Sequence, residues 1–129
     1  MRLDIRITPG SSVPIYRQIV DQVRFAVAGG DLAQGDQLPS VRALAERLVV
    51  NPNTVARAYQ ELARDGLIES RHGRGAFVTK SRQVYTRAER TRRLEQALDV
   101  LIGETLTLDL TPQEIRAALD RRLRKLTGA

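Results

Sequence analysis

The sequence contains no cysteine, and its 129 residues include a single histidine. Without thiolates the chain can form neither a disulfide nor a cysteine-ligated metal site, and it has no thiol nucleophile. The one histidine, His72, cannot supply two imidazole ligands to a metal, and any histidine-dependent catalysis would have to use it. We therefore expect no metal, no cofactor and no catalytic residue. The remaining enzymatic alternative is a hydrolase with paired carboxylates, but the candidate carboxylates are more simply explained as caps and surface charges: Asp31, Asp36, Glu46 and Glu61.

Long apolar runs are also missing from the sequence. None approaches the roughly 18 apolar residues of a membrane span. Arg2, Asp4 and Arg6 interrupt the amino-terminal residues where a signal peptide would have its apolar core. We expect a cytoplasmic protein without a membrane partner. The 21 basic and 15 acidic side chains leave a net charge of +6, with an isoelectric point near 10.7, which favours a polyanionic partner.

Three helices are predicted in the first eighty residues. The first has Pro14 in its first turn and ends at Gly29, because apolar residues recur between them at helical spacing. Ser40 is a favourable N-cap for a short second helix, and Asn51 for a third that has Pro52 at its first position. The apolar faces of these helices are Ile15, Ile19, Val20, Val23 and Val27, then Val41, Leu44, Ala45 and Leu48, then Val55, Ala58, Tyr59, Leu62 and Ala63.

The periodicity changes after Gly66, which is placed to end the third helix. Residues 67–71 and 76–79 predict two short strands, and two glycines in the intervening turn favour a hairpin. Residues 1–80 therefore predict a winged helix-turn-helix domain of three helices and a β-hairpin wing, in a mainly α chain. In such domains the helix after the tight turn enters the DNA major groove.

Candidate DNA contacts follow from the placement of polar residues on the predicted helices. The helix amino termini at Ser40 and Asn51 offer free backbone N–H groups to phosphates. Asn53, Thr54 and Arg57 lie in the first turns of the third helix, on the side opposite its apolar face. Asn suits adenine and Arg suits guanine, so these side chains are candidates for base contacts. The alternative for Asn51 and Asn53 is that they only cap the helix.

The predicted wing is basic at its tip. Arg71, His72 and Arg74 surround Gly73 and Gly75, whose missing side chains allow the backbone to approach a phosphate closely. An arginine at this tip could enter a narrow minor groove. The alternative is an ordinary hairpin turn in which His72 is only solvated.

Gly35 to Val78, "GDQLPSVRALAERLVVNPNTVARAYQELARDGLIESRHGRGAFV", and the upstream segment "PIYRQIVDQVRFAVAGG" resemble the DNA-binding domain of the GntR family of bacterial transcription regulators. The resemblance is carried by the spaced elements "LPS", "NPNTVARAY", "LARDGLI" and "GRGAFV". It implies that Arg42, two positions after "PS", contacts the DNA backbone or a base, although a solvated arginine is the alternative. Pro52 stands where the fatty-acid-responsive branch has a basic, base-contacting residue, so the operator of that branch is not expected here.

Residues 81–129 form a short tail, and this shortness resembles the YtrA-like branch, whereas larger branches carry an effector-binding or aminotransferase-like domain. One helix is expected from about residue 87 to 105, and a second after a capping box between Thr111 and Glu114. Two such helices cannot bury enough surface to be stable alone. They could pack on the winged domain, but we predict a homodimer that assembles four helices. The expected contacts are Leu94, Leu98, Leu101, Ile102, Ile115, Leu119 and Leu123.

These features predict a sequence-specific, DNA-binding transcription regulator and not an enzyme. It is expected to bind a palindromic double-stranded operator as a homodimer, because helix-turn-helix dimers pair their two-fold symmetry with paired half-sites. The resemblance implies a repressor. The alternative is a winged-helix module for protein assembly that has no sequence-specific DNA binding. The operator, the regulated genes and any small-molecule effector are not predicted.

Overall fold

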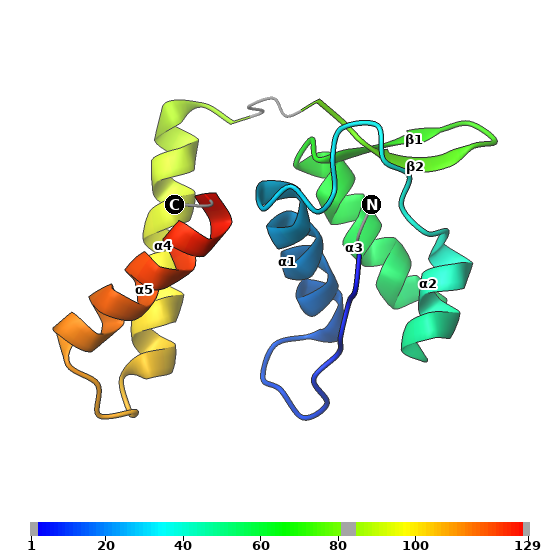
Figure 1. The fold of residues 1–129 in the computed structure, drawn as a ribbon. Coiled ribbons are helices and arrows are strands. Elements are labelled where there is room, and N and C mark those ends of the chain that lie inside the picture. The colour runs from blue at the N-terminus through cyan, green and yellow to red at the C-terminus, as the bar shows by residue number, and fades with distance from the viewer. Residues whose placement is uncertain (1–2, 81–84, 128–129) are drawn as a thin grey trace. The chain divides into compact units, whose positions relative to one another are not determined.

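The computed structural model describes residues 3–80 and 85–127. The chain forms two compact units, Met1–Arg82 and Gln83–Ala129, whose elements are labelled in Figure 1. Among the described residues, no helix is both long and apolar enough to cross a membrane. The first unit contains three helices and a hairpin, and the second contains two helices. This confirms the predicted winged helix-turn-helix fold with a two-helix tail.

The core of the first unit lies between its three helices, α1 (Ile15–Ala28), α2 (Val41–Leu48) and α3 (Pro52–Arg64). Helix α3 packs against both α1 and α2 and lies between them in Figure 1. Each helix contributes most of the apolar face that its sequence spacing predicted. The buried residues are Ile5, Ile19, Val20, Val23, Leu32, Leu38, Leu44, Ala45, Val55, Ala58, Tyr59, Leu62, Ile68 and Val78.

Local side-chain caps fix where α2 and α3 begin. The Ser40 hydroxyl accepts a hydrogen bond from the Ala43 backbone N–H at 3.0 Å, and the Asn51 side chain accepts one from the Asn53 N–H at 2.8 Å. Both satisfy backbone donors that have no partner inside the helix. Gly66 adopts a φ of +78° after α3, as predicted for a residue that ends a helix in the left-handed region.

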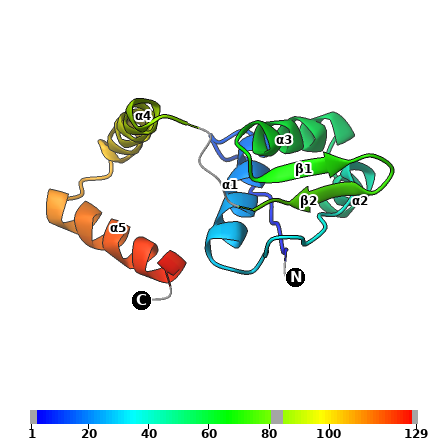
Figure 2. The same ribbon diagram turned by 90° about the horizontal axis from the view of Figure 1, so that it is seen from above.

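The wing is an antiparallel hairpin of β1 (Ile68–Arg71) and β2 (Gly75–Val78), in which Ile68 lies opposite Val78. Strand β1 contacts α3, and the hairpin lies alongside that helix in Figure 2. Residues 35–38 pair with the outer edge of β2 through three backbone hydrogen bonds of 2.8 to 2.9 Å. Residues 35–38 therefore form a third segment beside the two-stranded wing, with an isolated bridge between Gln37 and Phe77.

Three details of the first unit differ from expectation. Pro14 is the N-cap of α1 and not part of its first turn, because its backbone has a non-helical ψ of 149° while its carbonyl accepts a hydrogen bond from the Gln18 N–H at 3.0 Å. Ile15 is 39% exposed, and Ala63 is also exposed. These two residues were expected on the core face, but each lies at the edge of its helix where no neighbouring element covers it.

Val49 adopts the left-handed conformation in the turn between α2 and α3, with φ 56° and ψ 51°. A β-branched residue is strained in this region, and its side chain gains no packing because it is 89% exposed. We expect Val49→Gly to raise the free energy of unfolding by about 0.5–1 kcal/mol, after the larger chain entropy of unfolded glycine is subtracted. Thermal melts should show a rise of a few degrees, and a lower melting temperature would contradict the strain argument.

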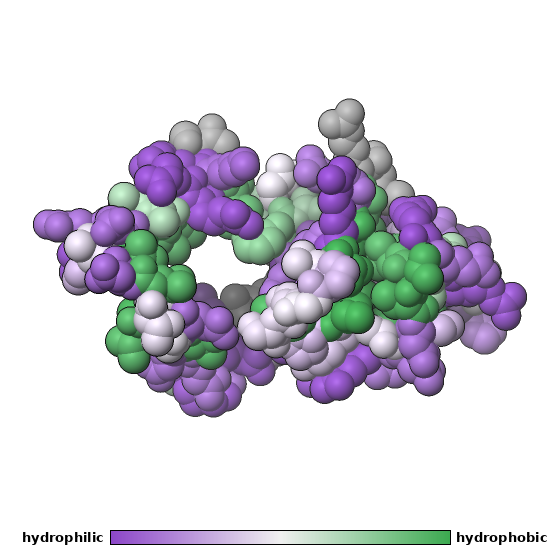
Figure 3. Space-filling view, turned by 90° about the horizontal axis from the view of Figure 1, so that it is seen from below, coloured by the Kyte–Doolittle hydropathy of each residue, from purple (hydrophilic) through white to green (hydrophobic). Residues whose placement is uncertain are grey.

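The second unit consists of α4 (Arg87–Thr105) and α5 (Pro112–Thr127). Thr86 caps α4. Thr111 and Glu114 form the predicted capping box before α5, with reciprocal hydrogen bonds of 3.0 and 3.1 Å. No residue of this unit that the structure describes is buried. On the tail, at the left in Figure 3, green apolar residues lie at the surface among purple hydrophilic ones.

Candidate nucleic-acid interface

The amino-terminal half of α3 presents polar side chains away from the core. Asn53 and Arg57 are exposed and Thr54 is half-buried, whereas Val55 and Ala58 point into the core with no exposed surface. A helix with 3.6 residues per turn places Asn53 and Arg57 on one face, because they are four positions apart. The structure therefore places the candidate base-contacting residues together on an outer face of α3.

Asn51 caps α3 with its side-chain oxygen, which is the capping role that the sequence analysis gave as an alternative. Asn53 enters this cap only through its backbone N–H, and within the described part of the chain its amide side chain has no hydrogen-bond partner. The two asparagines therefore differ in what they offer. Asn51 is committed to the helix terminus, and the side chain of Asn53 remains available to a ligand.

Arg57 does not extend freely into solvent. Its guanidinium carbon lies 3.8 Å from the centre of the Tyr16 ring on α1. No carboxylate among the described residues pairs with Arg57. The charge of Arg57 is thus not neutralised by an acidic residue of the described chain, and the guanidinium makes a cation–π contact with the Tyr16 ring.

The start of α2 combines a capped helix terminus with a free cation. Ser40 completes the cap with its hydroxyl, and Arg42 in the first turn is exposed. Within residues 3–80 and 85–127, the Arg42 side chain has neither an ion pair nor a hydrogen bond. Free backbone N–H groups and an unpaired guanidinium favour the same ligand, an anion such as a phosphate.

The wing holds its two arginines differently. The Arg71 guanidinium lies 4.4 Å from the centre of the Phe77 ring and 3.1 Å from a Glu69 carboxylate oxygen. Arg74 is exposed at the tip, and its side chain has no partner among the described residues. Because Glu69 offsets the charge of Arg71, the positive potential at the wing is stronger near Arg74 than near Arg71.

The wing tip is fixed through its backbone. The Gln37 side-chain amide donates a hydrogen bond to the Arg74 carbonyl at 2.7 Å. Gly75 has a φ of +107°, and a Cβ there would lie 3.0 Å from the Gln37 amide nitrogen. The glycine therefore allows both the turn and the contact with Gln37.

Two ion pairs connect α1 with the second half of α3 and its C-cap. Arg17 pairs with Glu61 at 3.2 Å, and Arg24 pairs with Asp65. Burial raises the pKa of the nearby Asp21 carboxyl, although Arg17 and Arg24 oppose this shift. Arg17 and Arg24 offset the charges of Glu61 and Asp65, so this part of the unit contributes little net positive charge.

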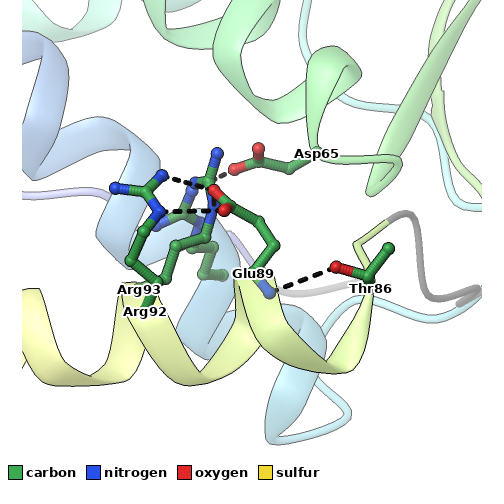
Figure 4. A network of polar contacts seen from close by, with 6 residues as sticks. Asp65, Thr86, Glu89, Arg92 and Arg93 are labelled. Atoms are coloured by element: carbon green, nitrogen blue, oxygen red, sulfur yellow. Dashed lines mark hydrogen bonds and ion pairs between the residues drawn. The ribbon is translucent and has the colours of Figure 1, made fainter.

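The start of α4 carries one acidic residue, Glu89, which pairs with two of four nearby arginines, Arg87, Arg90, Arg92 and Arg93. Glu89 contacts Arg92 at 2.5 Å and Arg93 at 3.2 Å, as Figure 4 shows together with the Thr86 cap. These hydrogen bonds, chiefly the one from Arg92, lower the pKa of Glu89 to about 2. Arg93 also lies over the Tyr85 ring at 3.9 Å. Glu89 therefore offsets only part of the positive charge at the start of α4.

Sequence reasoning did not identify Tyr16 and Gln37 as parts of the interface. Tyr16 is an aromatic residue within an amphipathic helix, where it is indistinguishable from a core residue. Gln37 lies in a loop, and its bond to Arg74 spans 37 positions in the chain. No local pattern encodes either contact, because both depend on how distant elements pack.

Comparison with known proteins places these features in a family. Residues 15–78 match the family described as bacterial regulatory proteins, gntR family. Over 77 residues the chain is 48% identical to the HTH-type transcriptional repressor YtrA of Bacillus subtilis (strain 168), which covers 60% of this chain and 59% of that protein. The chain thus matches less than two thirds of the length of YtrA.

Two further relatives extend the similarity into the tail. The uncharacterized HTH-type transcriptional regulator YhcF of the same organism is 36% identical over 105 residues, or 81% of this chain and 86% of that protein. The crystal structure of a transcriptional antiterminator from Listeria monocytogenes EGD-e aligns with a TM-score of 0.79 at 32% identity, covering 95% of this chain and 92% of that chain. The chain therefore belongs to the GntR family of bacterial regulatory proteins, in its YtrA-like branch.

Proposed function

We propose that this protein represses transcription by binding a palindromic DNA operator as a homodimer. The observation that carries the proposal is the set of unpaired polar and cationic side chains on three adjoining elements: Arg42 on α2, Asn53 and Arg57 on α3, and Arg74 on the wing. Each is exposed, and none is neutralised by a carboxylate among the described residues. The repressor role is supported by the name of the related YtrA.

The elements divide into two kinds of DNA contact in this proposal. Ser40, Arg42 and the wing tip contact phosphates, which set the position of the domain without specifying sequence. The first turns of α3 enter the major groove, where Asn53 and Arg57 contact base edges. Thr54 lies beside them at the same end of the helix.

The tail supplies the dimer interface in this proposal. Apolar side chains remain exposed along both helices, including Leu94 at 57%, Ile102 at 51% and Leu123 at 49%. A groove of about 570 Å³ on this unit is lined by residues that include Leu101, Leu110, Ile115, Ala118 and Leu119. Exposed apolar surface of this extent favours association, and a second copy provides an identical pair of helices.

The same proposal assigns no catalytic activity to the chain and places it in the bacterial cytoplasm, where the chromosome lies. The competing function is a winged-helix module for protein assembly. That alternative predicts DNA binding that is absent or insensitive to sequence, so the same binding experiment distinguishes the two.

The decisive experiment is selection of duplexes from a randomised library by the wild-type protein, followed by titration of a selected duplex at increasing salt. We expect an enriched inverted repeat. A protein that contacts about six or more phosphates loses about a thousandfold or more in affinity between about 50 and 200 mM salt, because bound counterions are released. Failure to enrich any sequence, or affinity that does not change over this salt range, would overturn the proposal.

The phosphate contacts have their own expected signature. Arg42→Ala and Arg74→Ala should each weaken binding to the selected duplex and to random duplex by similar factors, and each should reduce the salt slope by about one unit. Arg64→Ala is the control for loss of one positive charge, because Arg64 is exposed in the last turn of α3, and its effect should be smaller. A loss confined to the selected duplex would show that Arg42 or Arg74 contacts a base instead.

A further inference from the structure

We propose that Tyr16 is a positioning residue for Arg57, and that through Arg57 it sets how well the protein discriminates its operator from other DNA. The inference rests on the proposed function, because it assigns Arg57 a base contact. Tyr16 lies on α1, outside the helix-turn-helix pair. Its role would be to hold the arginine of α3 in one orientation before DNA arrives.

The geometry supports a stack between these two side chains. The Arg57 guanidinium carbon lies 3.8 Å from the centre of the Tyr16 ring, well inside the range of about 6 Å over which a ring face attracts a cation. Tyr16 is half-buried and packs against the core, so its ring is held in place. Arg57 is exposed and has no ion-pair partner among the described residues. The ring is thus the contact that restricts this arginine.

A stacked arginine can still bind DNA. In a stacked pair the ring contacts the flat face of the guanidinium, whereas the N–H donors point outward along its edges. The edge needed for a bidentate bond to guanine therefore stays available. An arginine side chain loses rotamer entropy when it is fixed. Holding it on Tyr16 removes part of this loss from the binding step.

Arg17 is the other arginine near this ring, and it is held by a different contact. Its guanidinium carbon lies 5.5 Å from the ring centre, and its charge is paired with Glu61 at 3.2 Å. The tyrosine ring therefore adds little to the placement of Arg17. This difference identifies Arg57 as the side chain that depends on Tyr16.

The test compares Tyr16→Leu with Tyr16→Phe. Leucine fills space in the core but removes the ring face, and phenylalanine keeps the face and removes only the hydroxyl. The readout is the ratio of dissociation constants for random duplex and for a duplex selected by the wild-type protein. We expect Tyr16→Leu to lower this ratio about three- to tenfold, the range for one cation–π contact, and Tyr16→Phe to leave it within about twofold. In an Arg57→Ala background, Tyr16→Leu should cause no further loss.

Thermal melts of each variant separate lost positioning from lost folding. If Tyr16→Leu unfolds, Tyr16→Met replaces it, because methionine adapts to irregular core space. An unchanged ratio for the folded variant, while Arg57→Ala lowers it, would overturn the role of Tyr16 and leave the proposed function intact. An unchanged ratio for Arg57→Ala would overturn the inference together with the base contact. Equal losses for leucine and phenylalanine would also overturn it, because they would implicate the hydroxyl and not the ring.

Discussion

Replacing Leu98 or Leu119 with aspartate should convert the protein from a dimer to a monomer. These side chains are 36% and 42% exposed in the single chain, so an aspartate is tolerated before association. In a four-helix interface the same carboxylate would lie among apolar side chains without a partner, at a cost of several kcal/mol. Sedimentation at micromolar concentration should show the change in mass, and affinity for a two-half-site operator should fall by orders of magnitude.

Val100→Asp is the matched control on the same helix. Val100 is 63% exposed and lies two positions after Leu98, on roughly the opposite side of α4. This variant introduces the same charge and should remain dimeric. Dissociation by all three variants would indicate a general effect of charge on the tail, and a wild-type protein that is monomeric at micromolar concentration would refute the predicted interface.

Asn53→Ala and Arg57→Ala should reduce operator discrimination. Loss of a good contact to a base edge costs about 1–3 kcal/mol on the selected duplex, or about five- to 150-fold in affinity, with a much smaller loss on random duplex. Asn53 and Arg57 lie off the buried face of α3, so both variants should remain folded. Paired titrations on the two duplexes measure the specificity ratio directly.

Arg64→Ala provides the comparison for charge alone. Arg64 is exposed in the last turn of α3, far along the helix from its amino terminus. Its removal should lower affinity for both duplexes slightly and leave their ratio unchanged. If Asn53→Ala and Arg57→Ala gave equal losses on both duplexes, α3 would not discriminate bases in the way we propose.

The elements of the fold were predictable because their signals are local. Ser40, Asn51 and Thr111 each place a capping oxygen within three residues of the N–H that it accepts from, and such short-range chemistry can be identified in a sequence. The apolar spacing of α3 likewise predicted its buried face. The fold class followed from these patterns, whereas the family followed from the resemblance of residues 35–78 to its DNA-binding domain.

The details of the candidate interface were less predictable, because they depend on contacts between distant residues. The sequence predicted Arg57 on the outer side of α3, but not its contact with the ring of Tyr16, which is 41 residues earlier in the chain. Arg71 and Arg74 are equivalent in the sequence, and only the structure shows that Glu69 neutralises the first. The strained Val49 also carries no sequence signal, since valine is rare in that conformation.

The attachment of the wing to residues 35–38 has a consequence for the kinetics of binding. A hairpin with four residues in each strand is marginally stable by itself, but here the third segment and Gln37 order it during folding. Little conformational entropy should therefore remain to be lost when the wing meets a nucleic acid, and the unit can dock nearly as a rigid body. Association should accordingly follow a single diffusive step whose rate increases with concentration, without a slower phase in which the wing becomes ordered.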